Sequence, residues 1–415
     1  MSEKLKDLSV AAKGRMTWPV IALLMVGLIF LIATVRVVSG ADDMDSSGTF
    51  RAAIRAAMPI ALVALGGLWA ERAGVVNIGL EGMMVMGTFA AGWAGYQWGM
   101  WAGVVAALVF GAVAGLLHAV ATVTFGVDHI VSGVAINVIA LGASQYLAGW
   151  AFTGQPGGGP TQSPRVESIP TITIPGISDA ALSIEKHHWF VISDVAALIG
   201  GVTTQLSLLT LLGVVLFVGT SWVLWRTTFG LRVRSVGEAP AAAESLGVNV
   251  YLYKYAGVII SGALAGLAGA FLVDDATVYR EGQTGGRGYI GLAAMIFGNW
   301  RPGGLAMGAG LFGFTDALRL RSGGESVHAL LLLIALILVL AALWLYWKQR
   351  SAGQPIGMLV LGLALLGVYL MINEVPGDFT GMTPYVTTLV VLCFAGGRLR
   401  PPAAVGVTYR KGSAG

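Results

Sequence analysis

The sequence predicts an all-α, polytopic transmembrane helix bundle of about 10 to 12 crossings, some of them broken or half helices. Its 415 residues are 56% hydrophobic and only 11% charged, whereas soluble domains carry roughly 25% charged residues. The mean hydropathy is +0.78. Apolar segments recur along the chain, and a helix needs about 20 such residues to cross a bilayer. These observations identify an integral membrane protein.

The transmembrane domain is expected over residues 17–396, between a basic tail at 1–16 and a second basic tail at 397–415. Residues 17–35 are apolar without a small-residue cleavage site, which predicts an uncleaved first span rather than a signal peptide. The apolar segments lie at about 17–38, 52–70, 80–95, 101–125, 129–153, 205–225, 256–273, 287–299, 304–321, 327–347, 355–373 and 384–396.

The distribution of Lys and Arg predicts the orientation in the membrane. With the N-terminus inside, the cytoplasmic side holds about twice as many of these residues as the outside, as the positive-inside rule requires. Both termini and the loop 226–255 are then cytoplasmic. The Pro- and Gly-rich stretch 154–204 is external and is expected to be irregular, apart from a short strand at TITIPGI. The net charge of +4 reflects this topology rather than nucleic-acid binding, because the basic residues are scattered.

The stretch Trp69–Gly87 places Glu71, Arg72, Asn77 and Glu81 among apolar segments and contains several glycines. A carboxylate inside the membrane costs about 2.5–3.5 kcal/mol and usually faces protein or a water-filled path. We therefore predict an interrupted helix that lines a route for a polar solute. The alternative is that Glu81 only caps a half-helix and pairs with a neighbouring amide.

Four polar residues are predicted to face one shared cavity, because unpaired polar groups are costly in lipid. They are Asn77, Glu81, Ser132 and Asn137. Amides and hydroxyls both donate and accept hydrogen bonds, which suits uncharged, hydroxyl-rich solutes.

An internal echo suggests a pseudo-repeat. Ile78-Gly79-Leu80-x-x-Met83 recurs as Ile290-Gly291-Leu292-x-x-Met295, each copy beside a glycine-bearing loop. Two matched, glycine-interrupted segments are typical of transporters with the pathway between the two halves. The small-residue ladder 261–270 is expected to allow close helix packing.

Several chemistries are excluded. The five histidines and the single Cys393 show no metal-ligand spacing. The dinucleotide-type pattern Gly286-x-Gly288-x-x-Gly291 lies in an apolar segment without a strand–helix crossover, and no phosphate-binding G-x-x-x-x-G-K-[ST] occurs. The chain is thus predicted to hydrolyse no ATP itself, to bind no cofactor or metal and to have no catalytic residues.

The loop 226–255 contains a rigid element suited to contact a partner. Pro240 fits the first turn of a helix, Glu238 complements its positive end, and Gly247 follows the alanine-rich turn as a C-terminal cap. We expect a short helix here.

ERAGVVNIGLEGMMVMG resembles the signature of permease subunits of nucleoside-type ABC importers, within the branched-chain amino acid and simple-sugar permease superfamily. Phe229-Gly230-Leu231-Arg232-x-Arg234-x-x-Gly237-Glu238-x-Pro240-x-Ala242-Ala243 followed by Gly247-Val248 is similar to the family's ATPase-contacting loop. The resemblance covers about 52–395. It departs at Asp128-His129, where the family usually has Asn-Glu, and in the long loop 154–204.

The resemblance implies a permease subunit for nucleosides, purine nucleosides above all, in the bacterial cell membrane. It implies as partners a separate ABC ATPase, a second permease subunit, related or identical, and an extracytoplasmic solute-binding protein. The coupling residues are then Arg234, Gly237, Glu238, Pro240, Ala242, Ala243 and Gly247. A permease for branched-chain amino acids or a simple sugar is the close alternative. A secondary transporter or channel is the alternative from a different class; a secondary transporter would use ion-binding midspan carboxylates, for which Glu81 and Asp316 are the only candidates. A membrane-embedded enzyme is the most distant alternative.

Overall fold

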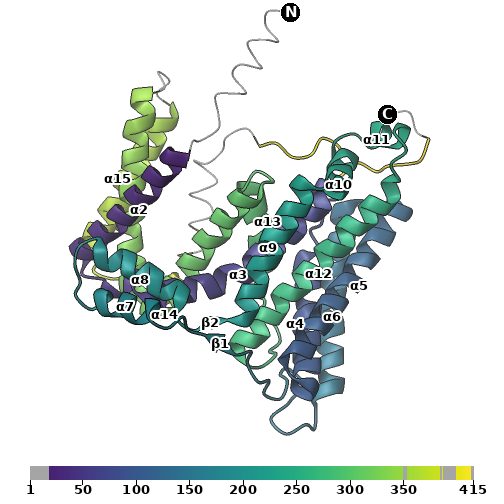
Figure 1. Cartoon of the computed structure of the whole chain (residues 1–415), viewed down its shortest axis with the longest axis horizontal. Helices are drawn as coiled ribbons and strands as arrows, with labels where there is room; N and C mark the ends of the chain where they lie inside the picture. Colours follow the sequence, from purple (N-terminus) through teal and green to yellow (C-terminus); the bar gives the residue numbers. More distant parts are fainter. Residues whose placement is uncertain (1–17, 349–352, 384–385, 387–398, 413–415) are drawn as a thin grey trace, which may run out of the picture. The chain divides into compact units, whose positions relative to one another are not determined.

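The computed structural model describes residues 18–348, 353–383, 386 and 399–412, and it confirms the all-α class (Figure 1). The sheet found in this part of the chain is one two-stranded antiparallel pair, β1 (Thr171–Ile172) with β2 (Leu206–Ser207). Seven of the described helices are long and apolar enough to cross a membrane. The chain divides into a smaller unit, residues 1–50, 175–202 and 321–380, and a larger unit, residues 51–174, 203–320 and 381–415.

The larger unit is built around four long helices, α4, α5, α6 and α12, which lie side by side in Figure 1. Glycines bring α5 and α12 together: a Cβ on Gly262 would lie 2.2 Å from the carbonyl oxygen of Gly111. The packing role predicted for the ladder 261–270 is thereby confirmed. The elements are α3 (Ser47–Arg72), α4 (Leu80–Trp98), α5 (Met100–Ala119), the π-helix η2 (Val120–Thr124), α6 (His129–Phe152), α9 (Leu208–Arg226), α10 (Thr228–Glu238), α11 (Pro240–Ser245), α12 (Val250–Ala276), α13 (Arg287–Phe297) and the first part of α14 (Pro302–Lys348).

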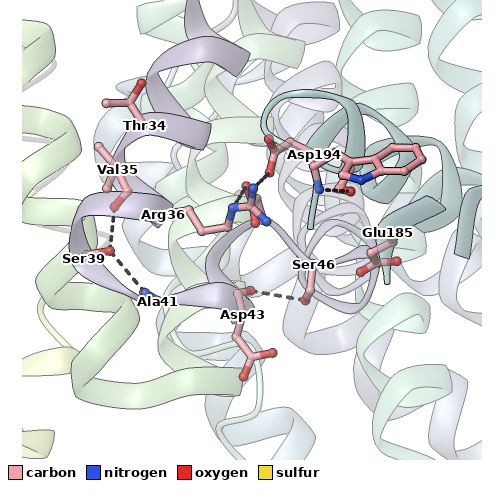
Figure 2. A network of polar contacts seen from close by, with 12 residues as sticks. Thr34, Val35, Arg36, Ser39, Ala41, Asp43, Ser46, Glu185 and Asp194 are labelled. Atoms are coloured by element: carbon pink, nitrogen blue, oxygen red, sulfur yellow. Dashed lines mark hydrogen bonds and ion pairs between the residues drawn. The ribbon is translucent and has the colours of Figure 1, made fainter. Parts of the chain in front are cut away.

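The smaller unit contains a buried ionic cluster. Arg36 Nη2 lies 3.1 Å from Asp194 Oδ1, and Arg36 Nε lies 3.6 Å from Asp45 Oδ2. Figure 2 shows the guanidinium pointing toward Asp194. The elements are α2 (Trp18–Ser39), the 3₁₀ helix η1 (Asp42–Asp45), α7 (Ile177–Glu185), α8 (Ile192–Thr203), the rest of α14, α15 (Gly353–Met371) and α16 (Gly377–Thr380).

One expectation needs correction. The stretch 154–204 is not irregular throughout, because it contains α7 and α8 as well as β1. Its turn-forming residues are concentrated before 177, whereas the residues of α8 are largely apolar or alanine. The two segments predicted at 304–321 and 327–347 are confirmed as separate helices: they share the label α14, but the non-helical dihedrals of Gly323 divide them. The tail 1–16 and most of the segment 384–396 lie outside the described residues.

Candidate functional site

The predicted helix break is confirmed. α3 ends at Arg72 because Gly74 takes a left-handed conformation with φ of +81°. Gly74 N donates to Glu71 O at 2.9 Å, and Val75 N donates to Ala70 O at 2.9 Å, which is the hydrogen-bond pattern of a Schellman motif. Since α4 starts at Leu80, residues 73–79 form a non-helical connection, here called the α3–α4 loop.

Two histidines hold the middle of the α3–α4 loop. His118 Nε2 lies 3.0 Å from Val76 O, and Val76 N donates to His129 Nδ1 at 3.2 Å. The other ring nitrogen of His118 lies 2.8 Å from Ser132 Oγ. Both backbone polar groups of Val76 are therefore satisfied by side chains of α5 and α6, which lets non-helical backbone lie inside the bundle.

Helix α12 holds the two ends of the same loop. The buried ammonium of Lys254 donates to Gly74 O at 3.2 Å, and Asn77 Nδ2 donates to Ser261 Oγ at 2.9 Å. Asn77 Oδ1 is buried and has no hydrogen-bond partner among the residues that the structure describes. Leaving a buried acceptor unsatisfied costs about 1–3 kcal/mol. The Asn77 oxygen is therefore an acceptor that a bound solute could satisfy at the centre of the site.

Glu81, in the first turn of α4, caps the start of α13. Its Oε1 accepts from Gly286 N at 3.1 Å, and its Oε2 accepts from Gly288 N at 2.6 Å. A carboxylate is favourable at the positive end of a helix. The local bonding is thus that of the capping alternative. The Glu81 carboxylate also joins the two segments that share the repeated Ile-Gly-Leu-x-x-Met pattern. Gly79 of the first copy precedes α4, and Ile290 of the second copy lies in the first turns of α13.

Asn137 of α6 joins both segments. Its Oδ1 accepts from Gly82 N at 2.7 Å, and its Nδ2 donates to Ile78 O at 3.1 Å and to Tyr289 Oη at 3.0 Å.

The structure therefore brings the four predicted path residues into one region. Asn77, Ser132 and Asn137 are buried, with exposures of 0%, 5% and 7%, and Glu81 is partly exposed. That they line the solute path stays a prediction.

A cavity of about 250 Å³ lies next to the α13 cap. Asp316 Oδ2 lies 3.0 Å from Arg287 Nη2, and Asp316 Oδ1 lies 2.9 Å from Arg319 Nη2. The remaining wall is mostly apolar. Lining residues are Ile60, Gly285, Arg287, Ile290, Phe312, Asp316, Arg319 and Gly381.

The predicted short helix is confirmed as α11, which starts at Pro240. Gly247 follows it with φ of +82°, Gly247 N donates to Glu244 O at 2.8 Å, and Val248 N donates to Ala243 O at 3.0 Å. This is again a Schellman motif. Ala242 is exposed, whereas Ala243 is buried.

Glu238 lies just before the N-cap of α11, and whether its charge complements the positive end of that helix stays a prediction. It is the last residue of α10, and α11 has no side-chain cap hydrogen bond. Its Oε1 lies 3.5 Å from Arg72 Nη1, and its Oε2 accepts from Ala403 N at 3.1 Å. Gly237, beside it, would place a Cβ 2.2 Å from Arg72 O. The end of α10 therefore packs directly on the end of α3.

The ends of α3 and α13 are also joined. Arg72 Nη2 donates to Trp300 O at 2.7 Å, and the Trp300 indole donates to the Glu71 carboxylate. Arg72 and Arg234 both stack on the ring of Trp225, at 5.6 and 5.7 Å from its centroid. Such cation–π contacts contribute about 0.5–2 kcal/mol each.

Sequence reasoning missed His118, His129, Lys254 and Trp300. The available signal was a polar side chain within or beside an apolar run, as in GLLHAV and YLYKYAG. Residues 399–410 were missed as well, because the tail was assigned no role. Over the described residues, no group of three or more His, Cys, Asp or Glu side chains is placed to hold a metal ion.

Comparison with known proteins agrees with this architecture. The sequence model of the family described as "Branched-chain amino acid transport system / permease component" matches residues 50–343. The guanosine ABC transporter permease protein NupQ of Bacillus subtilis is 33% identical over 366 residues, which are 86% of this chain and 94% of NupQ. The nucleoside ABC transporter permease protein NupC of Lactococcus lactis is 33% identical over 361 residues, 85% of this chain and 93% of NupC.

A second permease from each of these organisms is more distant. The guanosine ABC transporter permease protein NupP of Bacillus subtilis is 24% identical over 269 residues, 63% of this chain and 70% of NupP. No solved structure matches the chain. On the family match and the near full-length similarity, the chain belongs to the branched-chain amino acid transport system permease family of ABC transporters.

Proposed function

We propose that this chain is the permease subunit of an ABC importer for nucleosides, with purine nucleosides as the main substrates. The observation that carries the proposal is the 33% identity to NupQ and NupC over more than nine-tenths of their lengths, because both are named for nucleoside or guanosine transport. A permease for branched-chain amino acids or a simple sugar is the alternative within the family.

The cavity beside α13 supports a solute with one apolar face and one hydrogen-bonding face. Ile60 and Ile290 provide the apolar wall, while Arg287 and Asp316 provide donors and acceptors. An Arg guanidinium pairs well with the O6 and N7 acceptors of a guanine base, and a carboxylate can accept from the ribose hydroxyls. We place the solute path along this cavity and the α3–α4 loop.

The partners are proposed from the same evidence. The sequence contains no phosphate-binding G-x-x-x-x-G-K-[ST] motif, so a separate ATPase supplies the energy and docks on α11. Two different permeases in each of two organisms resemble this chain, which favours a second, non-identical permease subunit. An extracytoplasmic solute-binding protein delivers the nucleoside.

The orientation is proposed from the positive-inside rule, with both termini and α11 in the cytoplasm. Cysteines replacing Ser183 and Ser235 in a Cys393→Ser background should react with an impermeant reagent from opposite faces. Labelling of both from one face would contradict this orientation.

Uptake in cells that express the chain with its partner subunits tests the substrate. Labelled guanosine should accumulate, and excess adenosine or inosine should compete, while leucine and glucose should not. Competition by leucine or glucose instead would assign the chain to the alternative within the family.

A further inference from the structure

Residues 399–410, here called the C-terminal strap, run without helix or strand, through a turn at 403–406, across three separate parts of the larger unit (Figure 1). Arg400 N donates to Asn299 Oδ1 at 2.7 Å, just beyond the end of α13. Ala404 N donates to Gly237 O at 2.9 Å, at the end of α10. Gly406 N donates to Gly74 O at 3.3 Å, in the α3–α4 loop. The strap thereby connects the loop of the candidate path to the helix that precedes α11.

The strap also reaches α11 itself. Glu244 of α11 lies close to the Tyr409 hydroxyl, and the Tyr409 ring lies edge-on to Tyr251 at 5.5 Å between centroids. At the other side of α11, the Glu238 carboxylate accepts from Ala403 N at 3.1 Å. The strap thus contacts Gly237 and Glu238 before α11, Glu244 within it, and Tyr251 beyond it.

The strap and α12 both bond to one carbonyl of the α3–α4 loop. Gly74 O accepts from both Gly406 N and the buried Lys254 ammonium. Ala404 is 9% exposed, and its carbonyl oxygen lies 3.3 Å from the position of a Cβ on Gly74. Ala403, one residue earlier, is exposed and bonds only through its backbone in the contacts described here. The side chain of Ala404 is therefore buried between the strap and the rest of the larger unit, whereas that of the adjacent Ala403 faces solvent.

We propose that the C-terminal strap is a positioning segment that fixes α11 to the α3–α4 loop, so that a displacement of α11 moves the loop directly. The proposal rests on the proposed function, because α11 is displaced only if an ATPase docks there. A helix of six residues has too few internal hydrogen bonds to hold its own place. The strap contacts both sides of α11: backbone N–H groups of the strap bond to Gly237 and Glu238 before it, and the Tyr409 side chain lies against Glu244 and Tyr251.

The test compares Ala404→Arg with Ala403→Arg in the full chain. Because Ala404 is buried, an arginine at 404 has no room and should lift the strap, whereas arginine at the exposed position 403 extends into solvent. Hydrogen–deuterium exchange of peptides covering 73–79 and 238–248 should accelerate at least tenfold in Ala404→Arg. In Ala403→Arg it should stay within about twofold of the unmodified chain. This readout needs no substrate, so it can fail or succeed independently of the nucleoside assignment.

Coupling is measured next, in proteoliposomes with the complete transporter. Ala404→Arg should retain the ATPase on purification but lower uptake per ATP hydrolysed at least fivefold, while Ala403→Arg should match the unmodified transporter. If Ala404→Arg gives no folded protein, a chain that ends at Arg398 replaces it with the same expectations. Equal exchange and coupling in the 404 and 403 variants, or faster exchange confined to residues 399–410, would overturn the proposal.

Discussion

Substitution of Gly262 by alanine tests whether α12 is held in place by backbone contact with α5. A Cβ on Gly262 would lie 2.2 Å from Gly111 O and 2.9 Å from Gly115 Cα, where ordinary contacts begin at 3.4 Å. The helices must therefore separate by about 1 Å, and such overpacking costs about 1–3 kcal/mol. The intrinsic preference of a helix for alanine offsets about 0.5–1 kcal/mol of this cost.

The matched control is Gly219→Ala on α9, where an added Cβ meets nothing within 4 Å. It keeps the helix-propensity gain without the clash, so its thermal unfolding midpoint in detergent should be unchanged or slightly higher. The midpoint of Gly262→Ala should fall by a few degrees, as expected for about 1 kcal/mol in a domain of this size.

The same substitution should affect transport, because α12 carries Lys254 and Ser261, which hold the α3–α4 loop. Uptake by Gly262→Ala should fall further than its amount of folded protein, and uptake by Gly219→Ala should not change. Equal midpoints and equal uptake in the two variants would refute the reasoning.

Three further outcomes are expected. Burial beside the Asp194 carboxylate raises the pKa of Asp45 from 3.8 to about 8, despite the nearby Arg36, so the folded state keeps a proton that the unfolded state releases. Stability should therefore fall as pH rises from about 4 to 8, by at most about 1.4 kcal/mol per pH unit, and Asp45→Asn should flatten the profile of unfolding midpoint against pH. Glu81→Gln offers one acceptor oxygen in place of two and should lower uptake severalfold at equal yield; unchanged uptake would leave Glu81 as a cap only. Asn137→Leu removes three hydrogen bonds and should lower both uptake and the midpoint, and a normal value of either would contradict its joining role.

Features determined by a few neighbouring residues were predictable from the sequence. Gly74 and Gly247 end their helices because left-handed backbone favours glycine, and Pro240 starts α11 because a first-turn residue needs no N–H donor. The partners of those elements were not predictable. Glu238 was assigned only to the nearest helix end, and its hydrogen bond from Ala403 N, 165 residues away, was not foreseen.

The hydrogen-bond partners of the polar residues predicted to line the path were likewise not predictable from the sequence. The occurrence of these residues in apolar segments indicated a special site, but a side chain such as Lys254 can satisfy a loop carbonyl only if tertiary packing brings the two together. No periodicity or motif encodes that pairing. The helices α7 and α8 were missed for a different reason, because the composition of 154–204 was averaged across a turn-rich part and a helical part.

The hydrogen bonds at the two ends of α13 attach this helix to both α4 and α3. At its start, α13 is fixed to α4 by the Glu81 carboxylate, and beyond its end Trp300 is fixed to Glu71 and Arg72 of α3. The helices on either side of the α3–α4 loop are therefore both attached to α13. The end of α10 packs on Arg72 without room for a Cβ at Gly237. We therefore expect a displacement of α10 to shift α3 and α13 together, and with them the surroundings of Asn77 and of the cavity beside Arg287.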